Sequence, residues 1–135
     1  MFTLEDNTKA VLAQIEGGIE RALERMGMQG EGYAIDLVPV DTSALKTSIK
    51  HKVDTAESSV YIGSNENYAP YVELGTGIYA EGGGGRPTPW AYQDEKGEWH
   101  HTRGQEPQPY LRPAIEDHKQ TYRNILEDEL ASSLK

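Results

Sequence analysis

The 135-residue sequence contains no cysteine. This absence excludes disulfide bonds and every catalytic or metal-binding site that is built on a thiolate. No apolar run approaches the roughly 20 residues that a membrane-spanning helix requires, so no membrane partner is expected. The first residues are acidic and lack the basic segment with which a secretory signal begins. The sequence therefore predicts a protein that is made and used in a cytoplasm.

Positive charge is also scarce. Lys and Arg number 13 against 22 Asp and Glu, which gives a formal net charge of -9. The basic residues are scattered among acids, whereas a nucleic-acid surface needs them gathered against phosphate. We therefore expect that DNA is not specifically bound.

Apolar residues make up only 36% of the chain. The length suits one domain, residues 1–135, with one modest core. We expect the monomer to be marginally stable, so that burial against further copies or a partner would help it.

Helical spacing of apolar residues predicts an amphipathic helix from about Leu4 to Met26, with Thr3 as its N-cap. Gly17 and Gly18 lie within it, and simple tolerance is slightly favoured over close approach of another backbone. Gly27, Gly30 and Gly32 are expected to end this helix. A short extended segment is predicted from Tyr33 to Leu37.

The middle of the chain predicts a short helix followed by a hairpin. Asp41 is a good N-cap for a helix over roughly Thr42 to Ser48. Alternating residues from Ile49 to Thr55 predict a half-exposed strand, and Ser59 to Gly63 returns as its partner.

A second short helix is expected from Tyr68 to Leu74, ended by positive backbone angles at Gly75 and Gly77. The segment from Ile78 to Pro89 holds four consecutive glycines and predicts a mobile loop that reaches a neighbouring subunit. Gly84 and Arg86 are the interface candidates within it.

Trp90–Gln93 and Glu98–Thr102 predict a second hairpin, with Gly97 at the left-handed turn position. A last helix is expected from Tyr110 or Pro113 to Leu134. The fold class is therefore α+β: an antiparallel sheet of about four strands in two hairpins, packed against long N- and C-terminal helices.

No constellation for catalysis or for a cofactor is apparent. The adjacent His100 and His101 point to opposite faces of a strand, and no Asp or Glu is found at ligand spacing on the same face. The glycines of residues 82–86 lack the Lys-Ser or Lys-Thr ending of a phosphate-binding loop. We expect no metal, no cofactor and no enzyme. The rival hypothesis is a metal-dependent hydrolase that uses Glu73 with one of these histidines.

Glu73 stands in an otherwise apolar stretch, where a carboxylate must be paired. Two structural roles are open: an ion pair with Arg103 or Arg112, or hydrogen bonds to loop amides.

The chain has 8 Tyr and only 1 Phe. Tyr buries apolar area at one end and hydrogen-bonds at the other, which suits wet interfaces. Core packing would explain some of these tyrosines, and contact with another subunit is the alternative for at least two. Those that gather around the loop and the second hairpin are Tyr68, Tyr71, Tyr79, Tyr92 and Tyr110.

Four blocks of this sequence resemble, in order, the small neck proteins of long-tailed bacteriophages, a family of tail components. The blocks are Val38–Thr42 with Leu45 and Ser48–Ile49, then Tyr68–Gly77, Trp90–Gly104 and Pro109–Ala114. The sequence departs from the family at Ser43, where the family pattern usually has glycine.

The resemblance implies a minor virion protein, assembled in the host bacterial cytoplasm, at the junction of head and tail. It implies a homo-oligomeric ring, of six copies by tail symmetry, between head-closure proteins and tail-terminator or tail-tube proteins. DNA would pass through without being bound. The alternative is a tail-assembly chaperone that is absent from the virion. The interface or structural candidates are Asp41, Tyr68, Tyr71, Glu73, Gly75, Gly77, Tyr79, Gly84, Arg86, Trp90, Tyr92, Arg103, Tyr110 and Arg112.

Overall fold

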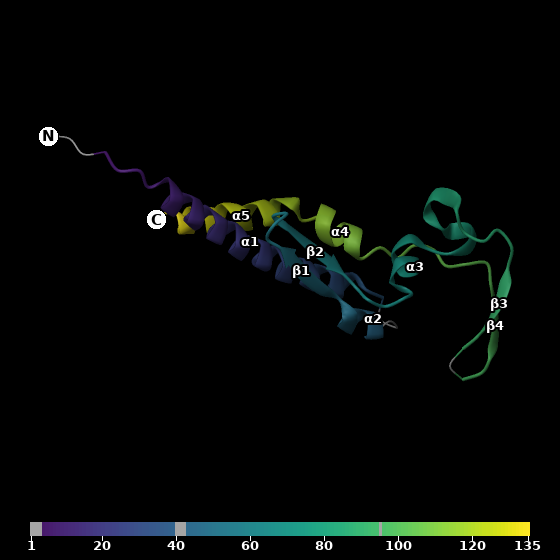
Figure 1. Cartoon of the computed structure of the whole chain (residues 1–135). Helices are drawn as coiled ribbons and strands as arrows, with labels where there is room; N and C mark the ends of the chain where they lie inside the picture. Colours follow the sequence, from purple (N-terminus) through teal and green to yellow (C-terminus); the bar gives the residue numbers. More distant parts are fainter. Residues whose placement is uncertain (1–3, 40–42, 95) are drawn as a thin grey trace.

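The computed structural model describes residues 4–39, 43–94 and 96–135. The elements in chain order are α1 (Thr8–Leu37), α2 (Ser43–Ser48), β1 (Lys50–Asp54), β2 (Ser59–Gly63), α3 (Ala69–Leu74), the 3₁₀ turns η1 (Gly77–Tyr79) and η2 (Glu81–Gly83), β3 (Trp90–Gln93), β4 (Trp99–Thr102), α4 (Leu111–Glu116) and α5 (Lys119–Ser133). The molecule is elongated (Figure 1). We call α1, α2, the first hairpin, α4 and α5 the body, and residues 69–104, which carry the second hairpin away from it, the arm.

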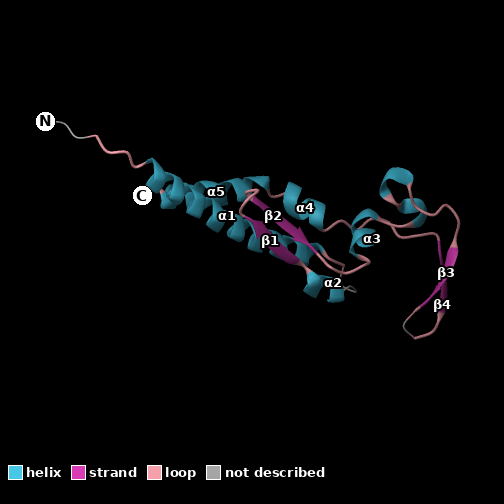
Figure 2. Ribbon diagram, in the orientation of Figure 1, coloured by secondary structure: helices cyan, strands magenta, loops and turns pink. Residues whose placement is uncertain are grey.

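The α+β class and both predicted hairpins are confirmed. The four strands form two separate two-stranded antiparallel sheets, one in the body and one at the far end of the arm (Figure 2). In the body, His51 of β1 lies opposite Ile62 of β2, and in the arm Tyr92 of β3 lies opposite His100 of β4. The hairpins therefore do not share one surface against the helices: only the first packs on α1.

Helix α1 is longer than the sequence predicts. It continues through Gly27 and Gly30 to Leu37, so the extended segment predicted over Tyr33–Leu37 is wrong. Both glycines are buried, and a Cβ at Gly27 would collide with the ring of His51, while one at Gly30 would collide with Ile62. These glycines serve the close packing of the first hairpin on the helix and do not end it. The predicted N-cap Thr3 lies outside the described residues.

Gly18 brings α5 close to α1. A Cβ there would lie 2.7 Å from Ser133 Oγ and 3.3 Å from the Glu129 carbonyl oxygen. Close approach therefore explains Gly18, and simple tolerance is the wrong reading for it. Arg25 adds ion pairs of 2.9 Å and 3.0 Å to Asp128 and Glu129 across the same contact.

The last helix is divided in two. Helix α4 ends at Glu116, and α5 begins at Lys119. Between them, the backbone of His118 is non-helical (φ -126°, ψ 25°), and its ring stacks on Tyr33 with centroids 3.5 Å apart. Tyr122 closes the break by donating its hydroxyl to the Ala114 carbonyl at 2.5 Å.

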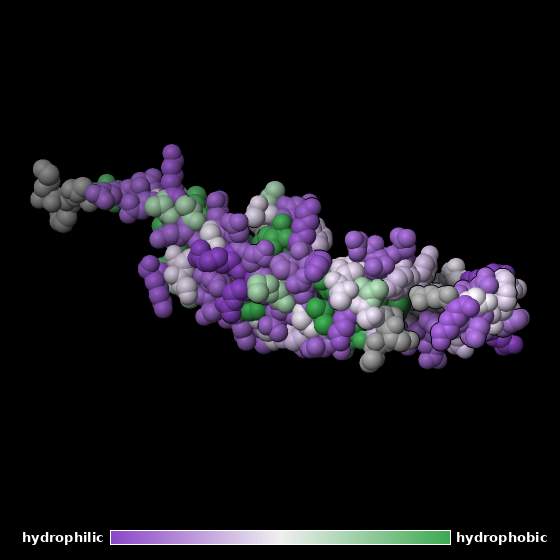
Figure 3. Space-filling model, turned by 90° about the horizontal axis from the view of Figure 1, so that it is seen from below, coloured by the Kyte–Doolittle hydropathy of each residue, from purple (hydrophilic) through white to green (hydrophobic). Residues whose placement is uncertain are grey.

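The core is small and lies where α1, α2, α3 and α4 meet. Its largest fully buried side chains are Tyr110, Leu45 and Ile49. They pack with the smaller buried residues Ala34, Val38, Ala69 and Ala114. Hydrophilic residues cover most of the face in Figure 3, with hydrophobic residues in scattered groups. This modest core agrees with the low apolar content of the chain.

Candidate functional site

Glu73 joins the arm to the body. It is 8% exposed, and its Oε2 accepts hydrogen bonds from the backbone amides of Tyr110 at 2.6 Å and Leu111 at 2.9 Å. Its Oε1 accepts from the amide of Arg112 at 2.8 Å. These amides begin α4 and lack helical acceptors, and the helix dipole favours a negative charge beside them. Of the two predicted roles, hydrogen bonding to backbone amides is the one observed, although the amides belong to the start of α4 and not to a loop. Among the described ion pairs Glu73 has no arginine partner.

The chain that leaves the body and the chain that returns from the arm are hydrogen-bonded to each other. Thr76 donates its amide to the Gln105 carbonyl at 2.9 Å, and the Gln105 amide donates to Thr76 Oγ1 at 2.9 Å. The Ile78 amide donates to the Arg103 carbonyl at 3.0 Å. We call this pair of hydrogen-bonded backbone segments the crossing, and it forms the base of the arm.

Gly75 and Gly77 have φ angles of 81° and 61°, as the sequence predicts. At Gly77 the close approach matters too, because a Cβ would collide with the Arg103 carbonyl. A side chain at Gly77 is therefore incompatible with the crossing at the base of the arm.

The glycine-rich segment is more structured than its composition predicts. It contains η1 and η2, and Arg112 of α4 forms a two-bond ion pair with Glu81, at 2.7 Å and 3.3 Å. Arg86 lies over the ring of Trp90, 5.5 Å from its centroid. The segment is thereby held near α3 and α4, whereas Gly84 faces open space.

Most of the predicted interface tyrosines are exposed on or beside the arm. Tyr71 is 60% exposed, Tyr92 is 45% and Tyr79 is 42%. Trp99, which the sequence analysis did not select, is 67% exposed. Tyr110 is fully buried and is explained by core packing. Several exposed aromatic side chains on a small projecting unit are typical of a protein-binding surface.

A largely apolar groove of about 460 Å³ runs beside α3. Tyr71, Leu74, Ala80 and Trp90 are among the residues that line it. The structure thus brings together at this groove the candidates Tyr71, Gly75, Gly77, Gly84, Arg86 and Trp90. It places Glu73, Tyr110 and Arg112 at the junction with the body. Asp41 lies outside the described residues.

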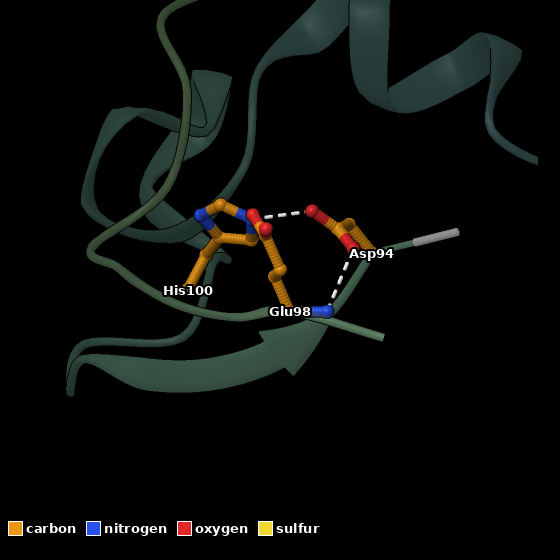
Figure 4. A group of neighbouring side chains, drawn as sticks. All are labelled: Asp94, Glu98 and His100. Carbon is orange, nitrogen blue, oxygen red and sulfur yellow. Dashed lines mark hydrogen bonds and ion pairs between the residues drawn. The ribbon is translucent and has the colours of Figure 1, made fainter. Parts of the chain in front are cut away.

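The second hairpin carries a cluster that the sequence analysis missed. Ligand atoms of Asp94, Glu98 and His100 all lie within 4.8 Å of one another (Figure 4). The expectation that no carboxylate lies at ligand spacing from His100 is therefore wrong. Glu98 and His100 lie two residues apart in the strand predicted over Glu98–Thr102, so alternation alone would have put them on one face. Asp94 required the turn geometry.

The residues proposed for the rival hydrolase do not form a site together. Glu73 is occupied by three amides of α4, so its oxygens are committed to holding that helix. It is not a member of the cluster around His100. Glu73 therefore does not form a catalytic or metal-binding site with His100.

Across the described part of the chain, no helix combines the length with the apolar character that a transmembrane segment needs.

A model of the family described as "Bacteriophage HK97-gp10, putative tail-component" matches residues 3–75, which is more than half of the chain. The matched region runs through α1, the first hairpin and α3 and stops at Gly75, at the base of the arm. No curated protein and no solved structure matches the chain.

Proposed function

Because the chain belongs to the HK97-gp10-like family of bacteriophage tail components, we propose that it is a structural subunit of the head–tail joint and forms an oligomeric ring. The family gives a virion-associated, tail-related role. The position at the neck, the ring and the contacts with head-closure and tail-terminator or tail-tube proteins are the proposed part.

The arm is the observation that carries the proposal. It projects from the body (Figure 1) and exposes Trp99, Tyr71 and Tyr92 to solvent. Its two-stranded sheet has order β3-β4, so both strands offer a free edge to another chain. A projecting unit with large exposed aromatics gains stability when a neighbour covers it.

The charge of the chain suits a channel through which DNA passes. Six copies, the number that phage-tail symmetry favours, would carry a formal charge of roughly -54 before screening by salt. Acidic side chains repel phosphate, so DNA would slide past such a ring without the counterion release that drives binding.

The test is assembly of the full-length chain, followed by native mass spectrometry and electron microscopy. We expect rings from the wild type and a loss of rings from Trp99→Ser, because the exposed indole contributes to contact and not to the core. The matched control is Tyr61→Ser, which removes an aromatic side chain that is 56% exposed on the body hairpin. Rings that form equally well with both variants would count against the arm as the interface.

Mass spectrometry of purified virions separates the proposal from the chaperone alternative. A ring component must be present in the particle in a fixed number of copies. Its complete absence from infectious virions, with tails still dependent on it for assembly, would identify a chaperone instead.

A further inference from the structure

We propose that the turn end of the second hairpin is a binding site for one zinc-class divalent metal ion, held by Asp94, Glu98 and His100. This inference does not depend on the role of the chain in the virion.

The three side chains come from one short stretch of chain and converge on one side of the hairpin (Figure 4). Asp94 follows β3, Glu98 immediately precedes β4, and His100 is the second residue of β4. The ring of His100 is positioned by Tyr92, which stacks on it with centroids 5.3 Å apart. The ligand atoms are therefore arranged by the hairpin itself.

Asp94 is held so that one oxygen remains for a ligand. Its Oδ1 accepts hydrogen bonds from the amides of Lys96 and Glu98, each at 2.9 Å. Its Oδ2 lies 2.7 Å from His100 Nε2. An ionised carboxylate only accepts, so this imidazole nitrogen carries the proton. A metal ion bound at Nε2 requires the other tautomer of the neutral imidazole, in which this proton has moved to Nδ1.

The spacing requires only a small adjustment. Zinc bonds of about 2.0–2.2 Å in tetrahedral geometry set neighbouring ligand atoms about 3.3–3.6 Å apart. His100 and Asp94 would therefore separate by about 0.6–0.9 Å from their 2.7 Å contact, and Glu98 would close in. Three protein ligands leave a fourth position for water.

Charge also favours a cation here. Asp94 and Glu98 place two carboxylates within 4.8 Å of each other, and like charges this close repel. Among the described ion pairs, no Lys or Arg contacts either of them; Asp94 pairs only with His100. The imidazole nitrogen selects a transition-metal ion over magnesium or calcium, which prefer all-oxygen sites.

Calorimetric titration of the full chain with zinc chloride tests the site. We expect one ion per chain. Losing a residue that merely supports a ligand typically costs 10–100-fold in affinity, so His100→Gln should cost at least about 100-fold. His101→Gln is the matched control, because that neighbouring imidazole lies on the opposite face and should leave binding unchanged. Equal losses in both variants, or no zinc binding by the wild type, would overturn the proposal.

The Glu98→Gln variant controls for the possibility that a substitution abolishes zinc binding only because it unfolds the hairpin. Glu98 is exposed, and its carboxylate has no hydrogen bond to another described residue, so this variant should keep its fold. We expect zinc to slow hydrogen exchange of the β3 and β4 amides in the wild type and not in Glu98→Gln. Magnesium binding as tight as zinc binding would mean that the carboxylates act alone, which would also contradict the assignment.

Discussion

The carboxylate of Glu73 accepts a 2.6 Å hydrogen bond from the backbone amide of Tyr110, which lies 37 residues further along the chain. This contact connects the first element of the arm with the first turn of the helix that follows it. It also explains why a carboxylate occupies a buried position in an otherwise apolar segment, since three amides satisfy its two oxygens.

Glu73→Gln should therefore destabilise the protein. The amide group of Gln offers one acceptor oxygen, so an NH₂ group would face at least one backbone N–H in a buried place. We expect a loss of about 1–3 kcal/mol in the free energy of unfolding, measured by urea titration. Glu81→Gln is the control, because it removes the same charge from an exposed ion pair and should leave the midpoint unchanged within error. Equal effects of the two changes would refute the anchoring role of Glu73.

His51 predicts a pH dependence of stability. Its Nε2 lies 2.8 Å from Glu24, and its Nδ1 lies 3.0 Å from Glu31 without hydrogen-bond geometry. The hydrogen bond to Glu24 raises the pKa of His51, which burial opposes and Glu31 reinforces. A raised pKa in the folded state means that His51 stabilises fully below its unfolded pKa of about 6.5. This contribution is lost as the pH rises through the higher folded value.

The comparison of wild type with His51→Gln by urea unfolding at a series of pH values isolates this term. We expect the difference in stability between the two proteins to shrink as the pH rises from 5.5 to 8.5. His101→Gln, which changes an exposed histidine, should follow the wild-type profile. A difference that is constant with pH would show that His51 acts through packing alone.

Gly77→Ala should open the base of the arm and leave the body folded. The residue has φ 61°, and its Cβ would collide with the Arg103 carbonyl. Strained backbone of this kind costs on the order of 1–3 kcal/mol. Hydrogen exchange should be faster at Thr76 and Ile78, with far-UV circular dichroism of the long helices retained. Gly84→Ala meets nothing within 4 Å and is the control. Unchanged exchange in Gly77→Ala would contradict the described crossing.

Two alanine substitutions in one helix should have opposite signs. Gly30→Ala would collide with Ile62 and should lower the melting temperature. Gly32→Ala is exposed in the same helix with nothing within 4 Å, so it should stabilise by roughly 0.5–1 kcal/mol through helix propensity. Thermal unfolding of both variants measures the effect. Stabilisation by both would show that the first hairpin does not pack on α1 as described.

The parts of the fold that depend on local signals were predictable. Strand alternation located both hairpins, and the positive φ angles of Gly75, Gly77 and Gly97 follow from glycine at turn positions. The end of α1 was not predictable in this way. Gly27 and Gly30 resemble helix terminators in sequence, and only the hairpin packed against them reveals why a helix tolerates them.

The candidate site shows the same division. The tyrosine content left core packing and exposure as alternatives, and only the structure shows that Tyr71 and Tyr92 are exposed while Tyr110 is buried. The partners of Glu73 likewise required knowing that α4 begins beside α3. The cluster around His100 required the shape of a turn, because Asp94 lies beyond the end of its strand. What the sequence did not reveal was which residues that are distant in the chain lie side by side in the fold.

The base of the arm also has a mechanical consequence. The chain enters and leaves the arm through adjoining backbone segments. Backbone hydrogen bonds join these segments between Thr76 and Gln105 and between Ile78 and Arg103. A force on the second hairpin would act on these hydrogen bonds together. It would be transmitted to α4 through Glu73 and from there to the packed helices α1 and α5. In the proposed ring, tension on the arm would therefore be spread along the whole length of each subunit, and no single flexible linker would have to carry it.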